Sequence, residues 1–212
     1  MIIPYCSVTT NKRNLHALSR YPWRFLLSTS MPNAVSLKRR NKDFANGYAI
    51  DNGAFADYSN QRPFQSEKFK RLIGIWGEGS DWVAVPDSIG NRNKTLEMAD
   101  YWIDKIPFNK VLVVQDGMKT EDLDAFKSKI VGIFIGGTTD WKLKTIPYWS
   151  QWALENKKLC HVGRVNSVRR LKCCVEACAT SFDGSGMARF VELAQRMTNA
   201  LIVIDKQMTL FI

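Results

Sequence analysis

No apolar run in this sequence reaches the length of about 18 residues that a membrane-spanning helix needs. The first residues, MIIPYCSVTTNKRN, have only a short apolar stretch and no basic run before it, so they make a poor signal peptide. We therefore expect an intracellular, cytoplasmic protein without membrane contact. The sequence also lacks internal repeats, linkers and low-complexity segments, and its 212 residues fit a single domain over residues 1–212.

Cysteines are few, odd in number and badly spaced for a framework of disulfides. There are five, and two of them are adjacent in a segment of helical character, so we expect free thiols. The CCVEAC run at 173–178 lacks the paired spacing of a structural zinc site. We expect no metal and no cofactor. The cysteines are Cys6, Cys160, Cys173, Cys174 and Cys178.

Negative charge is in short supply. The chain has 20 Asp and Glu against 30 Lys and Arg, which gives a net charge of +10 at pH 7. A surplus of this size is typical of proteins that bind phosphate-bearing partners, with nucleic acid first among them. A basic surface that is simply solvated would explain the charge alone about equally well, so the charge needs support from a site.

Short, continuous apolar runs recur along the chain and predict strands that are buried on both faces. Continuous apolar character is typical of a parallel sheet covered by helices, whereas a strand with one solvated face alternates. Eight such strands separated by helical segments predict an α/β fold, a compact (β/α)8 barrel. The expected strands are residues 2–6, 24–28, 48–51, 82–86, 111–115, 132–136, 159–163 and 181–183.

Segments with helical periodicity and capping residues lie between these strands. A doubly wound open sheet would suit the same alternation, but no GxGxxG follows the first strand, so the barrel is preferred. We expect the second helix, around PNAVSLKRR (32–40), to be short or irregular. The other expected helices are residues 64–76, 93–106, 120–130, 139–155, 166–179 and 186–201.

Polar or small residues end the later apolar runs. In a barrel of this kind the active site lies at the C-terminal ends of the strands, so these residues should meet at one mouth. Each Asp could instead cap the helix that follows it, about as often as not. Together at successive strand ends they indicate a polar pocket in an apolar scaffold. The residues are Asp51, Asp87, Gln115, Gly136, Gly137, Gly163, Arg164 and Asp183.

Five short motifs in order, DNGAF, PD, VQ, IGG and SFDG, resemble those of the tRNA-guanine transglycosylase superfamily. HVGRVNS adds to the likeness, which runs from the third expected strand to the eighth. The resemblance implies an enzyme, a pentosyltransferase that exchanges a base in a nucleic acid. Asp183 would be the nucleophile that attacks C1′ and forms a covalent intermediate, and Asp51 would be the general acid/base.

The same resemblance implies which residues bind the base. Asp87 would accept hydrogen bonds from N1 and N2 of guanine, Gln115 would donate to O6, and the backbone at Gly136 and Gly137 would complete the pocket. This set complements the donors and the acceptor on that edge of guanine. Phe55 follows Asp51 closely and is a candidate to stack on the base, although core packing suits any one aromatic better.

The loops after the seventh and eighth strands, where barrels commonly hold phosphate, read GRVNS and GSGMAR. They could grip the nucleic-acid backbone, although a solvated helix start explains each arginine alone about equally well. His161 lies within an apolar run and is better interpreted as a hydrogen-bonded interior histidine than as a catalyst. The backbone-binding candidates are Arg164, Asn166, Ser167, Ser185 and Arg189.

Members of the superfamily that act on tRNA carry a zinc subdomain with closely spaced cysteines after the barrel. This chain ends at Ile212, one helix and a short LIVID segment after Asp183. The resemblance therefore favours the phage and bacterial branch that inserts a free 7-deazaguanine base, such as preQ0, into DNA; in a phage, the protein would act in the bacterial host cell. A protein partner or a homodimer would supply the contacts that the subdomain makes.

Three alternatives remain beside the DNA enzyme. The first is a tRNA-guanine transglycosylase. The second is a hydrolytic N-glycosidase, in which water resolves the intermediate and leaves an abasic site. The third, a non-catalytic nucleic-acid-binding barrel, is disfavoured because unused buried carboxylates are costly to keep.

Overall fold

Eight parallel strands close into a barrel in the computed structural model, which describes residues 1–31 and 44–209. Each strand pairs with the next in the sequence, and β1 pairs with β8 to close the ring. The closed ring confirms the (β/α)8 barrel and excludes the open sheet. The strands are β1 (Ile3–Ser7), β2 (Arg24–Leu27), β3 (Tyr48–Ile50), β4 (Val83–Ala84), β5 (Lys110–Val114), β6 (Gly132–Ile135), β7 (Leu159–Val162) and β8 (Ser181–Gly184).

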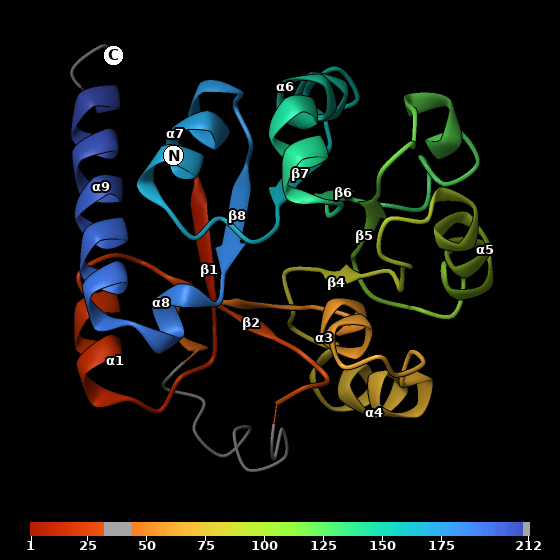
Figure 1. The fold of residues 1–212 in the computed structure, drawn as a ribbon, viewed down its shortest axis with the longest axis horizontal. Helices are drawn as coiled ribbons and strands as arrows, with labels where there is room; N and C mark the ends of the chain where they lie inside the picture. The colour runs from red at the N-terminus through yellow and green to blue at the C-terminus, as the bar shows by residue number, and fades with distance from the viewer. Residues whose placement is uncertain (32–43, 210–212) are drawn as a thin grey trace.

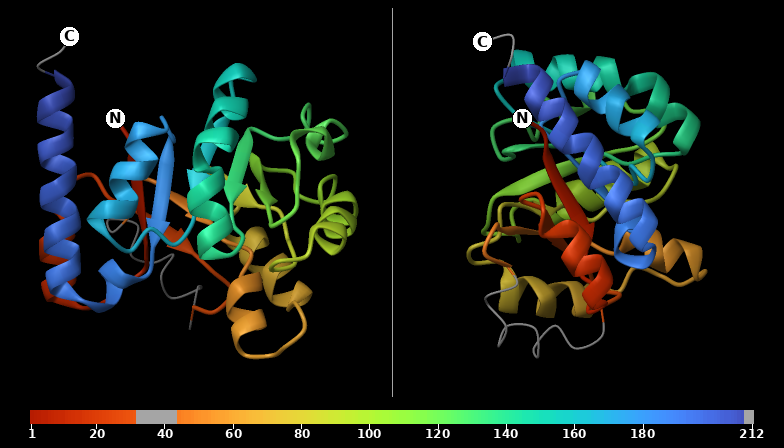
Figure 2. Two further views of the ribbon diagram at one scale, coloured as in Figure 1. Left: turned by 45° about the horizontal axis from the view of Figure 1, so that its top comes forward. Right: turned by 90° about the vertical axis from the view of Figure 1, so that its left-hand side faces the viewer.

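Helices surround the strands (Figures 1 and 2). Several begin at a residue whose side chain accepts a hydrogen bond from the first turn, such as Asn11, Asn91 and Ser167. The helices described are α1 (Lys12–Leu18), α3 (Ala54–Ser59), α4 (Ser66–Trp76), α5 (Arg92–Trp102), the 3₁₀ helix η2 (Thr120–Leu123), α6 (Thr139–Glu155), α7 (Val168–Glu176), α8 (Gly186–Arg189) and α9 (Val191–Thr209).

The apolar core has two parts because side chains of a strand point alternately to its two sides. The larger part lies between the strands and the helices. The smaller part fills the barrel and includes Tyr5, Trp82 and Val113. In β8, the register pairs Asp183 with Tyr5, so this carboxylate belongs to the side chains that face the barrel interior. The last inward-facing layer is therefore polar, and it lies at the C-terminal mouth.

Helix α9 packs against α1 and covers the junction of the first and last strands (Figures 1 and 2). The indole of Trp23 donates a 3.0 Å hydrogen bond to the buried hydroxyl of Thr198, and Tyr21 donates a 2.5 Å bond to Asp205. Helix α9 runs through the LIVID segment (residues 201–205) to Thr209, whereas the predicted helix ends at residue 201.

The expected helix over 120–130 is also wrong. The chain forms η2 and then a series of turns up to residue 129. Leu123 and Phe126 are both buried, and their three-residue spacing suits a 3₁₀ helix, in which side chains three apart eclipse. An ion pair between Arg92 and Asp122 attaches this segment to the start of α5.

Smaller differences concern the limits of elements. The helix expected over 186–201 is two helices, because Phe190 has an extended backbone, with φ −121° and ψ 114°. Strand β4 has two residues rather than the five expected over 82–86. Helices α1 and α3 were not predicted, and the expected second helix at 32–40 lies outside the described residues.

Candidate active site

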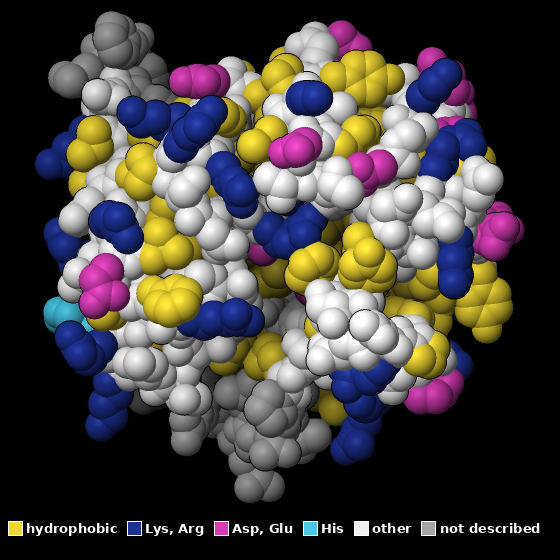
Figure 3. Space-filling model, viewed as in Figure 1, with side chains coloured by type: hydrophobic (Ala, Val, Ile, Leu, Met, Phe, Trp, Pro, Cys, Tyr) yellow, Lys and Arg dark blue, Asp and Glu magenta, His cyan; other side chains and the backbone are white. Residues whose placement is uncertain are grey.

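The residues predicted for the site gather at the C-terminal mouth of the barrel. Asp51 directly follows β3, Gln115 follows β5, and Gly136 follows β6, whereas Asp87 lies three residues beyond the short β4. Asp183 is inside β8. Figure 3 shows a hollow in this face, with an acidic side chain visible inside and hydrophobic and basic side chains around it. The mouth is therefore acidic within and basic at its margin.

Both carboxylate oxygens of Asp183 are held by groups on β7 and the loop after it. Oδ2 lies 3.1 Å from Nε2 of His161, and Oδ1 accepts a 3.3 Å hydrogen bond from the backbone N–H of Arg164. The residue is 8% exposed, so a substrate can approach it only from the mouth. The contacts orient the carboxylate without pairing it with an arginine or lysine side chain, which would reduce its nucleophilicity.

His161 is fully buried and hydrogen-bonded at both ring nitrogens, as the sequence predicts. Its Nδ1 lies 2.9 Å from the hydroxyl of Ser181, and its ring stacks on Phe134 with 4.7 Å between centroids. Burial lowers the pKa of His161, so the imidazole is neutral near pH 7 and can donate one N–H to Asp183. The sequence did not predict that Asp183 would be its partner.

Asp51 has the environment of a proton carrier. Its backbone N–H donates to the carbonyl of Leu27 at 2.7 Å, and its Oδ2 accepts a 3.2 Å bond from the N–H of Gly53. Burial, followed by the charges of Asp183 and Asp87, raises the pKa of Asp51 to about 7, although hydrogen bonds from Gly53 and Ser28 lower it. At neutral pH the group can therefore both give and take a proton.

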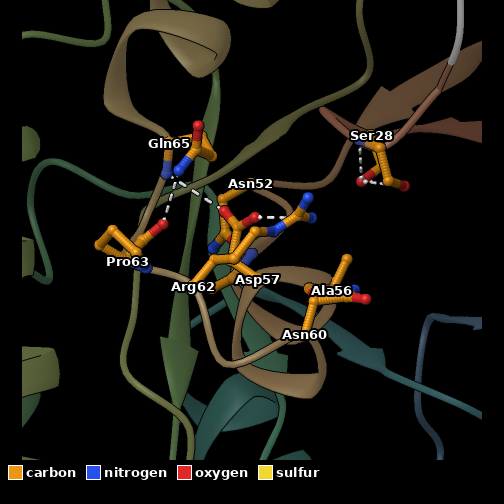
Figure 4. A network of polar contacts seen from close by, with 10 residues as sticks. Ser28, Asn52, Ala56, Asp57, Asn60, Arg62, Pro63 and Gln65 are labelled. Atoms are coloured by element: carbon orange, nitrogen blue, oxygen red, sulfur yellow. Dashed lines mark hydrogen bonds and ion pairs between the residues drawn. The ribbon is translucent and has the colours of Figure 1, made fainter.

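Gly53 makes the turn between Asp51 and helix α3 possible. Its φ is +83°, and a Cβ at this position would lie 1.9 Å from the hydroxyl oxygen of Thr29. The far end of α3 is fixed by Asp57, whose carboxylate pairs with Arg62 at 3.3 Å and accepts a 3.1 Å bond from the N–H of Gln65 (Figure 4). The DNGAF motif is thus a rigid turn that presents Asp51 at the mouth.

Asp87 and Gln115, the two predicted base-binding side chains, are joined to each other. The amide of Gln115 donates to Asp87 Oδ2 at 2.5 Å, and the amide of Asn52 donates to Oδ1 at 2.7 Å. Gln115 Oε1 accepts 3.0 Å bonds from the N–H groups of Gly90 and Gly137. This network fixes the orientation of the Gln115 amide, and it links the loops after β3, β4, β5 and β6.

The charge of Asp87 is balanced within this network. Burial raises its pKa to about 6, although the hydrogen bonds from Asn52 and Gln115 and the charge of Arg164 lower it. Asp87 is therefore largely a carboxylate at neutral pH, an acceptor for N–H groups. Gly136 allows the close approach of Gln115, since a Cβ at this position would lie 2.7 Å from the Gln115 amide nitrogen.

Arg164 lies over the mouth, in contact with two of the other predicted residues. Its guanidinium carbon is 4.4 Å from the ring centroid of Phe55, and the same group donates a hydrogen bond to the carbonyl of Gly137. Phe55 is 44% exposed, with the Arg164 guanidinium over its ring. The two side chains predicted for different tasks, base stacking and backbone binding, are thus stacked on each other.

The remaining candidates for binding the nucleic-acid backbone are spread over the loops after β7 and β8 and the helices that follow. Asn166 accepts a 2.9 Å bond from the N–H of Gly186 and so ties the loop after β7 to the loop after β8. Ser167 caps α7 by accepting a 3.3 Å bond from the N–H of Arg170. Ser185 is half-buried before α8, and Arg189 is exposed on that helix. Asn166 and Ser167 therefore have structural roles that account for them without a ligand.

Two residues of the site were missed. Asn52 supports Asp87, and its place inside DNGAF would have been enough to propose it. Lys142 is 2% exposed and donates a hydrogen bond to the carbonyl of Gly163, next to the site. Its spacing of four and seven residues from the buried Ile146 and Trp149 is the one sequence signal that places it on the inner face of α6.

All five cysteines are free thiols. Within residues 1–31 and 44–209, no group of three or more His, Cys, Asp and Glu side chains is arranged to hold a metal ion. In the same part of the chain, no helix is long and apolar enough to cross a membrane.

No protein-family model and no curated protein matches this chain.

Proposed function

We propose that this barrel is a nucleic-acid guanine transglycosylase that replaces guanine in DNA by a 7-deazaguanine base of the preQ0 type. One observation carries the proposal. Two carboxyl groups meet at the mouth in different environments: Asp183 is held as an acceptor by neutral donors, and Asp51 has a pKa raised to about 7. Pairs of carboxyl groups with such divergent environments are typical of a nucleophile and its acid/base partner.

In the first step, a carboxylate oxygen of Asp183 attacks C1′ of the target nucleotide. The bond from C1′ to the guanine nitrogen breaks, a bond from C1′ to Asp183 forms, and Asp51 gives its proton to the departing base. In the second step, Asp51 takes a proton from the incoming base, whose nitrogen attacks C1′ and releases Asp183. Two displacements at one carbon retain the anomeric configuration.

The network around Asp87 supports guanine-type bases. In this proposal the Asp87 carboxylate accepts hydrogen bonds from the N1 and N2 positions. The Gln115 amide, fully buried beside Asp87, would donate its second hydrogen to O6 of a base that enters the network. Atom 7 of the base makes no contact in this scheme, so guanine and 7-deazaguanine could use the same groups. The exposed ring of Phe55 offers a stacking surface once the guanidinium of Arg164 leaves it.

The charge of the chain supports a polymer as the substrate. A base inside a duplex must be flipped out before C1′ can be reached, and the net charge of +10 favours binding to the deformed phosphate backbone. We take DNA as the polymer because the family resemblance favours it, and tRNA is the alternative.

The test supplies labelled guanine or labelled 7-cyano-7-deazaguanine together with duplex DNA or, separately, tRNA. We expect label in DNA from the wild-type protein and none from Asp183→Asn. Asp140→Asn is the matched control, since Asp140 is exposed in the first turn of α6, and it should retain activity.

Label only in tRNA would change the polymer but not the reaction. Free guanine and abasic sites without label would replace the transglycosylase by a hydrolytic N-glycosidase. If neither polymer gains label or releases guanine, the proposed catalysis is refuted altogether. The remaining interpretation is then a barrel that binds nucleic acid. Activity that survives in Asp183→Asn would refute the assignment of the nucleophile.

A further inference from the structure

Lys142 on α6 is a buried lysine outside the proposed reaction. It lies on the face of the helix that carries Ile146 and Trp149, and it is 2% exposed. Among the ion pairs that join described residues, none includes its ammonium group. Burying an ammonium group without a carboxylate partner is costly, so the position calls for an explanation beyond packing.

The hydrogen bond from Lys142 ends on the peptide group next to Asp183. Its Nζ donates to the carbonyl oxygen of Gly163, and the N–H of the same peptide group, which belongs to Arg164, donates to Asp183 Oδ1 at 3.3 Å. A peptide group is planar and its C=O and N–H point in opposite directions. Holding the carbonyl on one side therefore directs the N–H to the carboxylate on the other.

The backbone at Arg164 indicates that this orientation is imposed. Its φ is +61°, a strained left-handed conformation that residues other than glycine rarely adopt. If the peptide rotated, Asp183 would lose the bond to Oδ1 and keep only the contact of Oδ2 with His161. The carboxylate could then turn away from the direction of attack.

We propose that Lys142 is a positioning residue, which fixes the Gly163–Arg164 peptide group and through it the carboxylate of Asp183. The inference rests on the proposed function for the role of Asp183 as nucleophile. The contact with the peptide group stands on the geometry alone. Lys142 thus acts from the helix layer, outside the barrel, on a residue inside it.

The charge on Lys142 adds an electrostatic effect to the geometric one. A positive charge at the carbonyl oxygen polarises the peptide group and makes its N–H a stronger donor. Burial lowers the pKa of Lys142 to about 7, so this effect should fade as the pH rises through 7. The charged and titratable groups that act on Lys142 or respond to it are Arg164, Arg170 and Cys174, Asp183 and His161.

Other groups near the site titrate in the same range, and variants separate them. Burial raises the pKa of Cys174 to about 12, so this thiol stays neutral. Asp51, with its pKa near 7, is the main competitor. A signal that disappears in Lys142→Met and persists in Asp51→Asn belongs to the lysine.

The first measurement follows the backbone amide of Arg164 by NMR. In the wild-type protein we expect slow hydrogen exchange and a chemical shift that titrates with a midpoint near pH 7. In Lys142→Met the exchange should be at least about tenfold faster and the titration should vanish. Lys142→Arg, which keeps a donor and a charge, should retain part of the protection. Lys144→Met, an exposed lysine on the same helix, is the matched control and should change nothing.

The second measurement is base exchange. We expect kcat to fall about 10²-fold in Lys142→Met with KM little changed, and to recover in part in Lys142→Arg, because a misplaced reacting group typically costs this much. An Arg164 amide that behaves identically in wild type, Lys142→Met and Lys142→Arg would overturn the inference. If Lys142→Met does not fold, the titration of the Arg164 amide in the wild-type protein and its exchange in Lys142→Arg still test the inference. A wild-type protein without activity would refute the proposed function alone, since the amide measurement needs no turnover.

Discussion

A carboxyl group that keeps its proton up to about pH 7 makes stability depend on pH in an unusual direction. The pKa of Asp51 rises from 3.8 in the unfolded chain to about 7 in the fold, so between these values the folded state binds more protons. Stability then falls as the pH rises from about 4 to about 7 and stays low above it. Asp87, with a pKa near 6, acts in the same direction.

We predict that Asp51→Asn is more stable than wild type at pH 8 and similar to it at pH 4.5. The difference should be at most about 4 kcal/mol, since one pKa unit corresponds to about 1.4 kcal/mol. Urea unfolding at the two pH values measures it. A difference that is the same at both would show that Asp51 has an ordinary pKa in the fold.

The protonation state of Asp51 should also determine how the rate of base exchange depends on pH. Asp51 must be protonated to assist the departing base, so we predict that kcat/KM falls above about pH 7 for the wild-type protein. Asp51→Asn, which carries no carboxylic acid proton, should have a low rate and a weaker alkaline limb, since only the titration of Lys142 then acts in this range. A wild-type rate that is flat from pH 6 to 9 would remove Asp51 from the acid role.

Single residues of the site were predictable from sequence where their position in a strand decides where their side chains point. Asp51 and Gln115 directly follow their strands, and Asp183 is the next-to-last residue of β8. The C-terminal ends of all the strands meet at one mouth. Their partners were not predictable, because a hydrogen bond between residues of different strands depends on register. The contact of His161 with Asp183 exists because β7 and β8 pair His161 with Ser181, and no local pattern states that register.

At the scale of elements, the turn from β3 into α3 depends on a glycine. We predict that Gly53→Ala lowers stability by at least about 1–2 kcal/mol and impairs exchange, because alanine at φ +83° is strained and its Cβ meets Thr29. Gly74→Ala is the matched control. Gly74 is exposed inside α4 with open space around it, so alanine there should stabilise by about 0.5–1 kcal/mol. Thermal unfolding of the two variants measures both effects, and equal shifts of the same sign would contradict the role of the turn.

The attachment of α9 gives a second prediction at this scale. Thr198 is fully buried and accepts the hydrogen bond from the indole of Trp23. Thr198→Val keeps the shape and removes the acceptor, so it should cost about 1–3 kcal/mol by leaving a buried donor unpaired. Thr198→Ser keeps the hydroxyl and therefore the acceptor for Trp23, so it should lose less stability than Thr198→Val. Urea midpoints that rank the serine variant below the valine variant would show that packing outweighs this bond.

Helices and strands with a regular apolar period were predictable. The exceptions arise where contacts elsewhere in the fold favour another conformation. The α6 boundaries agree with the sequence expectation over 139–155. The 120–130 segment has a helical pattern but forms η2 and turns, because the contact of Asp122 with Arg92 and the three-residue spacing of Leu123 and Phe126 favour a tighter coil. Such tertiary contacts are invisible to a reading of periodicity.

The whole molecule combines an acidic interior at the mouth with an excess of positive charge, +10 over the full chain. Buried carboxylates sit where a base would react, and exposed arginines lie on the helices that follow β7 and β8, including Arg169 and Arg189. Both helices begin at the C-terminal end of the barrel, as the mouth does. Under the proposed function, this distribution separates catalysis from attraction of the polymer, so the two can be tested independently.

Binding to duplex DNA should therefore weaken steeply with salt even when catalysis is abolished. For Asp183→Asn, we predict a linear fall of log K with log salt concentration, and a slope smaller in magnitude by about two in the Asp183→Asn, Arg169→Gln, Arg189→Gln triple variant. Lys127→Gln is the matched control on the same background, because Lys127 is exposed just before β6, at the opposite end of the barrel. It also removes one charge but should leave the slope unchanged.

Fluorescence anisotropy with a labelled duplex at 50 to 300 mM salt measures these slopes. If Lys127→Gln reduced the slope as much per charge as the two arginine changes do, the attraction would come from net charge alone and not from the helices beside the mouth.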